Sequence, residues 1–428
     1  MRRITPQKLL NVSMIVVFVI LVLPLYAIRG LNDSLDHARG TGTVGGIDFK
    51  AYYIAADMLR SGKDFYDVQQ QTKEVQARGL PPNESFYIYP PLLAILFVPL
   101  TTLPLPQAAQ VWFFLNMALY GLSLVVISRE LNLGRHSGIL PLLSILAFLF
   151  PPALFTLYKG QVNMVILLLL AVTFWLCLRE RQVLAGVSLG VASMVKVIPI
   201  LLLPYFLWRR KYTLCLTAAA TMAAIAILGL IVVGWGPHRT YLSSVLPSLA
   251  QPRPNPGNQS IGGFLSLLLV ENPYVEGLTH DPLLWRMATL SASAVVVAGV
   301  VLTLWLRRGR AARPDLEFAL IVAALPLITN IAWVDLFVLL IFPYAVLLNY
   351  VFRRQIRKLW VVLATISATC ITCPRLQDLF TNLVTGYEPF LRNPIIMGLP
   401  LWGLVLLCVA TAATLWEAPH QESPHAAR

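Results

Sequence analysis

An acidic residue beside the first apolar run is the first feature of this sequence that could do chemistry. Asp48 stands near the start of the stretch Gly45–Arg60, and from Phe49 to Leu59 the apolar residues recur at helical spacing. This pattern predicts an amphipathic helix that lies on the membrane surface with its aromatic face down. A carboxylate at the start of such a helix could serve as its N-cap or as a general base that faces a substrate. The two roles do not exclude each other.

Further polar side chains lie within or beside apolar segments, where ionisable and amide groups are costly and are functional hypotheses by default. Lys196 is the most informative, because it lies among apolar residues with no neighbouring acid and therefore predicts a distant anionic partner. The remaining candidates for substrate contact are Lys159, Tyr52, Tyr89, Gln161, Asn163, Asn258, Gln259, Asn330 and Asp335.

Several of these candidates also have a purely structural interpretation. Lys159 could be an interfacial lysine that extends its charged end towards water. Gln161 and Asn163 could be amides that are satisfied at the start of a helix, and Asn330 and Asp335 could be turn residues. Sequence alone leaves these alternatives open.

The composition identifies a polytopic membrane protein. Of the 428 residues, 57% are hydrophobic and 12% are charged, whereas soluble domains are roughly one quarter charged. The net charge of +13 does not indicate nucleic acid, because the basic residues come in short bursts at 2–3, 209–211, 307–310 and 353–354. Such bursts between apolar runs are the positive-inside pattern, so we expect multiple crossings of the plasma membrane.

The basic bursts, taken as cytoplasmic anchors, define the expected topology. Residues 9–28 form a retained signal anchor, which leaves 29–88 as a large first external loop and 236–282 as a second. One transmembrane domain covers 1–416, and 417–428 is a polar cytoplasmic tail. The other predicted spans are 107–128, 138–157, 212–235, 283–306, 316–332, 336–352, 359–373 and 395–416.

Some apolar runs are too short for a full span of about 20 residues. Residues 91–103 are bracketed by prolines and are predicted to be re-entrant, and 261–270 to dip into the membrane without crossing it. Between the basic residues Arg181 and Arg209 we expect a hairpin of short helices, bent at Lys196–Pro199. The predicted fold class is therefore all-α and polytopic, with about ten to thirteen transmembrane or re-entrant helices.

Several short motifs together resemble glycosyltransferase family 87, whose members are GT-C-type membrane enzymes that include mycobacterial polyprenol-phosphate-mannose-dependent mannosyltransferases. The resemblance extends from about residue 9 to about residue 350. In chain order the motifs are Asp48-Phe49 with Tyr52-Tyr53, Tyr89-Pro90-Pro91-Leu92, Lys159-Gly160-Gln161-Val162-Asn163, the run from Ala185-Gly186 to Lys196 that ends in Pro199, and Asn258-Gln259-Ser260.

The resemblance implies an enzyme that transfers a hexose, with mannose expected, from a polyprenyl-phosphate sugar to a glycan or glycolipid on the external face, with inversion. It also implies that Asp48 is the general base. One departure stands out: family members often carry a histidine pair after the tryptophan of a later turn, whereas Trp333 is followed by Val334, Asp335 and Leu336. This departure leaves the identity of the donor and of the acceptor open.

The residue types fit this chemistry independently of the resemblance. A base must take the proton of the acceptor hydroxyl, and a cation must hold the departing phosphate as its charge grows. Asp48 can supply the first group, and Lys196, with Lys159 as the second candidate, can supply the other. We expect the bilayer, the lipid-linked donor and the acceptor as partners, and neither a cofactor nor a metal site, while dependence on a divalent cation stays open.

Other functions remain as alternatives. An arabinofuranosyltransferase of the same type would use the same groups on another sugar. A transporter or flippase for a lipid-linked or small polar solute would place polar groups at mid-membrane depth and use paired discontinuous helices. A non-catalytic scaffold for envelope assembly is favoured only by the altered turn at Asp335.

Overall fold

Helices are the regular secondary structure of the described part of the chain. The computed structural model describes residues 47–80, 85–135, 139–308, 310, 312–372 and 393–418. Within these residues there is no named strand, and one isolated bridge joins Asn258 to Trp333. The all-α prediction is therefore confirmed for the described residues. The predicted signal anchor 9–28, the start of the first loop, the loop 374–392 and most of the polar tail lie outside them.

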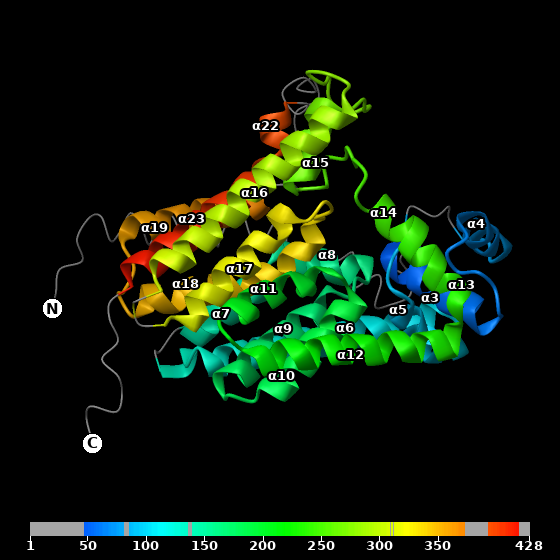
Figure 1. The fold of residues 1–428 in the computed structure, drawn as a ribbon, viewed down its shortest axis with the longest axis horizontal. Helices are drawn as coiled ribbons and strands as arrows, with labels where there is room; N and C mark the ends of the chain where they lie inside the picture. Colours follow the sequence, from blue (N-terminus) through cyan, green and yellow to red (C-terminus); the bar gives the residue numbers. More distant parts are fainter. Residues whose placement is uncertain are drawn as a thin grey trace.

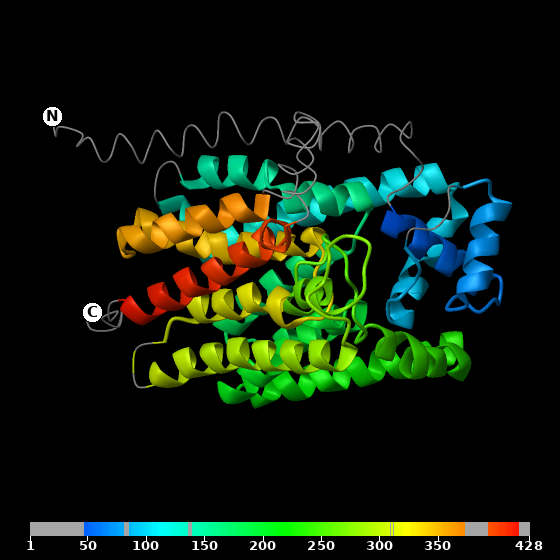
Figure 2. The ribbon, with the colours of Figure 1, turned by 90° about the horizontal axis from the view of Figure 1, so that it is seen from above.

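Long apolar helices run side by side along the longest axis of the molecule, as both ribbon views show (Figure 1, Figure 2). Five helices in the described residues are long and apolar enough to cross a membrane, by length and composition. They confirm the predicted spans at 107–128, 212–235, 283–306, 336–352 and 395–416. These helices are α6 (Leu105–Glu130), α12 (Tyr212–Val233), α16 (Pro282–Leu306), η6 with α18 (Val334–Leu340 and Ile341–Phe352) and α23 (Leu399–Glu417).

Bent and short helices fill the rest of the bundle. The predicted span 138–157 is a pair of helices bent by 45° at a break, where Pro151 and Pro152 begin the second helix. The pair is α7 (Ile139–Phe148) and α8 (Pro151–Lys159), and the other short helices are α5 (Pro91–Phe97), η2 (Val98–Thr102), α9 (Asn163–Leu178), α10 (Gln182–Val195), η4 (Ile198–Leu202), α11 (Leu203–Trp208), α17 (Pro314–Ile328) and α19 (Lys358–Thr372).

The predicted hairpin around Lys196 is confirmed. Helix α10 ends at Val195, Lys196 is extended, and η4 begins at Ile198 with Pro199 in its first turn. Because proline has no N–H group, a helix cannot run through this point without losing a hydrogen bond. The bend therefore follows directly from the sequence. The run 261–270 forms α15 (Ile261–Leu269), which at nine residues is too short to span a bilayer.

Small helices gather at one end of the long ones. Helices α3 (Ile47–Arg60) and α4 (Val68–Ala77) lie there together with α13 (Trp235–Thr240), as both ribbon views show. The segment after α13 continues through η5 (Tyr241–Val245) and α14 (Leu246–Ser248). The remaining short elements are η3 (Leu133–Arg135) and α22 (Pro394–Met397).

The predicted orientation of α3, with its aromatic face turned to the membrane, is wrong. Phe49 and Tyr52 are fully buried, and both rings contact Phe97 of α5, with centroids 6.0 and 5.1 Å away. Ile54 and Ala55, on other sides of the helix, are also fully buried. The aromatic pattern of α3 therefore reflects burial inside the protein, because apolar residues cover more of its circumference than the one-sided interpretation assumed.

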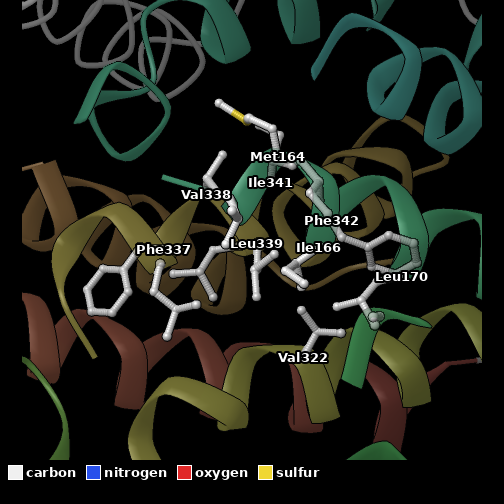
Figure 3. Close-up of a cluster of buried hydrophobic side chains, with 14 of the residues drawn as sticks. Met164, Ile166, Leu170, Val322, Phe337, Val338, Leu339, Ile341 and Phe342 are labelled. Atoms are coloured by element: carbon white, nitrogen blue, oxygen red, sulfur yellow. The ribbon is translucent and has the colours of Figure 1, made fainter. Parts of the chain in front are cut away.

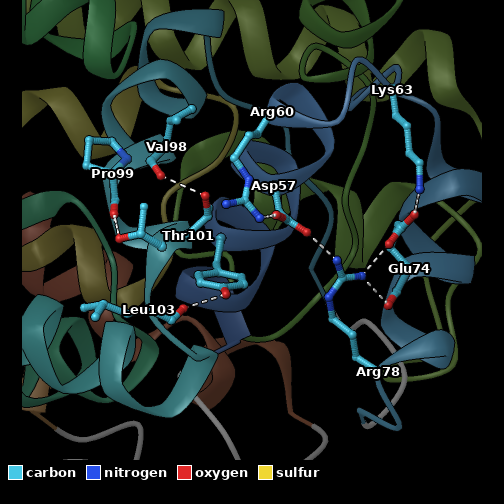
Figure 4. A network of polar contacts seen from close by, with 11 residues as sticks. Asp57, Arg60, Lys63, Glu74, Arg78, Val98, Pro99, Thr101 and Leu103 are labelled. Carbon is cyan, nitrogen blue, oxygen red and sulfur yellow. Dashed lines mark hydrogen bonds and ion pairs between the residues drawn. The ribbon is translucent and has the colours of Figure 1, made fainter.

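The far end of α3 is polar and is fixed to α4 by ion pairs. Asp57 accepts hydrogen bonds from Arg60 and Arg78, while Glu74 of α4 accepts them from Lys63 and Arg78 (Figure 4). Arg78 thus joins the two acids. This network orients α3 so that its other end, which carries Asp48, enters the protein.

A fully apolar cluster supports the element that carries Asp335. Every residue of η6 is buried. Figure 3 shows η6 packed between α9, α17 and α18 through Met164, Ile166, Leu170, Val322, Phe337, Val338, Leu339, Ile341 and Phe342. The carboxylate of Asp335 is therefore presented from a rigidly packed segment rather than from a mobile turn.

Gly160 joins three helices at the end of α8. Its φ of +67° is in the left-handed region, and its N–H closes the last turn of α8. A Cβ atom at this position would lie 2.6 Å from the Cβ atom of Phe49 in α3. The Gly160 carbonyl also accepts a hydrogen bond of 2.7 Å from the indole of Trp112 in α6. Only glycine fits both the backbone conformation and the close approach.

We expect Gly160→Ala to lower the free energy of unfolding by roughly 2–4 kcal/mol, because strain in the left-handed region adds to overpacking against Phe49. The measurement is the midpoint of thermal unfolding in detergent. Gly121→Ala in α6 is the matched control, since no atom lies within 4 Å of a Cβ there and alanine favours a helix. Equal midpoints for the two variants would contradict the packing described here.

Candidate functional site

Charged side chains from four separate segments converge in the bundle. Asp48 comes from α3, Lys159 from the end of α8, Lys196 from the bend after α10, and Asp335 from η6. Lys159 Nζ lies 2.8 Å from Asp335 Oδ1. Lys196 interacts electrostatically with both Asp335 and Asp48. The structure thus brings together the acid and the lysines that the sequence singled out, although they are far apart in the chain.

Both carboxylate oxygens of Asp335 accept hydrogen bonds from other side chains of the protein. Its side chain is 1% exposed, Oδ1 accepts from Lys159, and Oδ2 accepts a hydrogen bond of 3.0 Å from Asn163 Nδ2. Its backbone carbonyl accepts from Thr156 Oγ1 at 2.8 Å. Asp335 also lines a cavity beside Lys196, so its contact with substrate stays a prediction. Asp335 neutralises Lys159, which also lies 5.6 Å from the ring centroid of Trp333.

Asn163 links this ion pair to Lys196. Asn163 Oδ1 accepts a hydrogen bond of 2.7 Å from Lys196 Nζ, while its amide nitrogen donates to Asp335. The orientation of the amide is fixed, since a carboxylate only accepts and an ammonium only donates. Lys196 retains two further donors. Among the described residues, no carboxylate lies within ion-pair distance of Lys196.

Tyrosines and an amide connect α3 to the start of α9. Tyr52 donates to Gln161 Oε1 at 2.9 Å, and Gln161 Nε2 lies 3.0 Å from the hydroxyl oxygen of Tyr89. The rings of Tyr52 and Tyr89 meet edge to face at 5.0 Å. Lys196 Nζ lies 5.8 Å from the centroid of the Tyr89 ring. Hydrogen bonds thus connect α3 to Gln161 and Tyr89, and the Tyr89 ring lies beside Lys196.

Asp48 lies in the first turn of α3, one residue after the helix begins, and is 8% exposed. Its Oδ1 accepts a hydrogen bond of 3.0 Å from Ser85 Oγ. Burial raises the pKa of the Asp48 carboxyl, and the charge of Asp335 raises it further, whereas Lys159 opposes the shift. A higher pKa makes the ionised carboxylate a stronger base than an ordinary aspartate, so the environment suits proton abstraction.

A cavity of about 350 Å³ opens beside Lys196. Asp48 is not among its lining residues and is connected to it through Gln161 and Tyr89. Its polar and aromatic lining residues are Tyr89, Lys196, Tyr241, Thr329, Asn330, Trp333 and Asp335, and the other lining residues are apolar. The arrangement offers a cation and an apolar wall to one ligand, which fits an amphiphile with an anionic head.

Asn258 and Gln259 hold loops together. Asn258 Oδ1 accepts from the N–H of Ala332 at 2.9 Å, and Gln259 Nε2 donates to the carbonyl of Met397 at 2.8 Å. Neither residue lines the cavity. Asn330 does line it, yet its Nδ2 donates to the carbonyls of Leu249 and Gln251, both at 2.8 Å. All three amides are thus bonded to backbone groups, and their contact with substrate stays a prediction.

Two residues of this region were not singled out by the sequence. Thr156 binds the backbone of Asp335, and Tyr241 lines the cavity from the segment after α13. Neither carries a motif that would have marked it. In the described residues, no group of three or more His, Cys, Asp or Glu side chains is placed to hold a metal ion.

We expect Asp335→Asn to lower the free energy of unfolding by about 2–3 kcal/mol, because it leaves the Lys159 ammonium without its counter-ion in a largely buried site. Adding Lys159→Gln should recover most of this loss. Denaturant titration of the two variants in detergent measures both effects.

Arg60→Gln, which breaks an exposed ion pair with Asp57, serves as the control and should cost less than about 1 kcal/mol. If the double variant were no more stable than Asp335→Asn alone, the counter-ion role of Asp335 would be wrong.

Comparisons with known proteins agree with the expected family. Residues 87–330, more than half of the chain, match the model of glycosyltransferase family 87. The chain is 30% identical over 228 residues to the polyprenol-phosphate-mannose-dependent alpha-(1-2)-phosphatidylinositol pentamannoside mannosyltransferase of Mycolicibacterium smegmatis, covering 52% of each chain. It is 32% identical over 190 residues to the protein of the same name from Mycobacterium tuberculosis, covering 43% of this chain and 42% of that one.

The chain therefore spans about half the length of the curated relatives it matches. Among solved structures, ArnT from Cupriavidus metallidurans in the apo state is similar with a TM-score of 0.39 and 15% identity, over 95% of this chain and 77% of that one. The family match rests on sequence and includes Tyr89, Lys159, Gln161, Asn163, Lys196 and Asn258. The chain belongs to glycosyltransferase family 87.

Proposed function

We propose that this protein transfers a hexose, with mannose as the expected sugar, from a polyprenyl-phosphate sugar to a glycan or glycolipid acceptor. The curated relatives are named for a polyprenol-phosphate-mannose donor and a phosphatidylinositol mannoside acceptor. The observation that carries the proposal is a lysine, held by an amide, that lines a largely apolar cavity and interacts electrostatically with the buried acid Asp48. The acid can take the proton of the acceptor, the lysine can bind the phosphate, and the apolar wall can bind the lipid tail.

Lys196 binds the phosphate of the donor. Lys159 is paired with Asp335 at 2.8 Å, whereas Lys196, among the described residues, donates a hydrogen bond only to the neutral amide of Asn163, and it lines the cavity. A phosphate diester carries one negative charge, and Lys196 makes no ion pair with a described carboxylate, so the phosphate can bind its ammonium group directly. Lys159, the second candidate from the sequence, is thus assigned a supporting position.

The apolar wall of the cavity suits the isoprenoid tail. A second, largely apolar cavity of about 300 Å³ shares Leu201 with the first and continues between α11, α16 and α17. Burial of a hydrocarbon chain contributes about 0.8 kcal/mol per CH₂ group. The tail can therefore supply most of the binding free energy, while Lys196 fixes the position of the phosphate.

The transfer itself is an inverting displacement at the anomeric carbon. Asp48 removes the proton of the acceptor hydroxyl, the new bond forms between this oxygen and the anomeric carbon, and the bond to the phosphate oxygen breaks. The electron pair of that bond leaves with the polyprenyl phosphate, whose growing charge Lys196 stabilises. No metal or cofactor step is required for this balance, and dependence on a divalent cation is a separate question.

The charge distribution supports an external active site in the plasma membrane. Helix α9 begins at Asn163 in the site and is followed at its other end by Arg179. Helix α11 ends before Arg209, and α18 ends before Arg353, both at the end of the bundle away from the site. Because basic residues favour the cytoplasmic side, the site faces outward.

We expect Asp48→Asn to lower the rate of sugar transfer by roughly 10²–10⁴-fold, because the amide cannot accept the hydroxyl proton. The assay uses purified protein in nanodiscs, a panel of mannosyl and arabinofuranosyl polyprenyl phosphates, and a glycolipid acceptor. The donor that is consumed identifies the sugar.

Asp57→Asn is the matched control, since Asp57 lies on the same helix but only forms ion pairs with Arg60 and Arg78. It should keep near-normal turnover. Near-normal turnover of Asp48→Asn would instead exclude Asp48 as the base.

A transporter or flippase remains the second candidate, because the extended residue Lys196 between short helices resembles the broken helices of secondary transporters. The same nanodisc preparation, reconstituted into vesicles, distinguishes the two functions. Movement of a labelled lipid-linked sugar without consumption of any donor would favour the transporter.

A further inference from the structure

The tyrosines around the cavity differ in how their hydroxyl groups are satisfied. Tyr52 and Tyr89 bond to Gln161, while the hydroxyl of Tyr66 donates to the Tyr89 carbonyl at 2.6 Å. Tyr87, in the same aromatic cluster, also donates to a backbone carbonyl at 2.6 Å. Tyr241 is the exception: its hydroxyl is buried and has no hydrogen-bond partner within the described part of the chain.

Tyr241 is held firmly in this position. It is 7% exposed, and its ring lies 5.8 Å from that of Tyr66. It begins η5, a π-type turn, and such turns are frequent at functional sites. Burial raises the pKa of Tyr241 to about 12, so the hydroxyl keeps its proton at neutral pH and is available as a donor.

A buried hydroxyl without a partner is unfavourable, and such groups in folded proteins usually have a specific explanation. Tyr241 is also one of the residues that line the cavity, together with Lys196 and Asn330, although its hydroxyl itself is enclosed. A ligand with several oxygen acceptors, placed against Lys196, would enter the same space. The sugar and the phosphate of a lipid-linked donor are rich in such acceptors.

We propose that the hydroxyl of Tyr241 donates a hydrogen bond to the sugar-phosphate head of the donor, in addition to the bond made by Lys196. This inference rests on the proposed function and deepens it, since it assigns a second contact to the donor head. The hydroxyl would thereby help to position the anomeric carbon relative to the phosphate.

The test is Tyr241→Phe, which removes a single oxygen atom and keeps the ring. We expect about a tenfold loss of affinity for a polyprenyl-phosphate hexose in nanodiscs, the amount that one hydrogen bond of ordinary to charge-assisted strength supplies. The midpoint of thermal unfolding without donor should be unchanged or higher, because the substitution removes an unsatisfied group. A purely structural role cannot produce this combination.

Tyr120→Phe is the matched control. Its hydroxyl donates to the Ala147 carbonyl at 2.9 Å, and it does not line the cavity. The control should lower the unfolding midpoint and leave donor affinity unchanged. Bare polyprenyl phosphate is titrated in parallel: loss of affinity for both lipids places the contact on the phosphate, and loss for the glycosylated lipid alone places it on the sugar. Either result supports the proposal.

Two other results would overturn it and are distinguishable. If the wild-type protein binds and consumes the donor while Tyr241→Phe matches it in affinity and rate, the Tyr241 contact is wrong and the proposed function stands. If the wild-type protein binds neither lipid, the proposed function is wrong and the contact is excluded with it.

Discussion

The buried carboxylate of Asp335 is the interaction on which the rest of the site depends. It neutralises Lys159 and orients the amide of Asn163, and that amide in turn holds Lys196. An isolated charge in such surroundings is strongly unfavourable, whereas a pair with fully occupied hydrogen bonds is tolerated. The two lysines therefore differ in role. Lys159 is paired with Asp335, whereas Lys196 lines the cavity, where it can bind an anionic ligand.

This arrangement requires helices that are distant in sequence to pack closely against one another. Gly160 lets α3 approach the end of α8, and the Trp112 indole fixes the carbonyl of the same residue. The apolar packing of η6 holds Asp335 from the other side. Family members often carry a histidine pair near this turn, and here an acid that binds Lys159 stands in that region. In this chain the turn therefore carries an ion pair between Asp335 and Lys159.

Much of the fold could be predicted because the signals were local. The bend at Lys196 followed from Pro199, and the long spans followed from hydropathy and basic flanks. The burial of α3 could not be predicted, since a helix with aromatic residues on one side looks alike whether lipid or protein covers it. The Lys159–Asp335 pair joins residues 176 positions apart, and Tyr241 carries no motif, so only tertiary structure reveals their partners. Asn258 and Gln259 matched a family motif, and the structure shows them binding backbone groups.

The most direct test of the central claim is an experimental structure in nanodiscs with a non-transferable phosphonate analogue of the polyprenyl-phosphate hexose. The account predicts that an oxygen of the anionic head lies within hydrogen-bond distance of Lys196 Nζ, that Lys159 stays paired with Asp335, and that the sugar lies on the side of Asp48. A head group bound to Lys159, or placed among the arginines at the opposite end of the bundle, would contradict it.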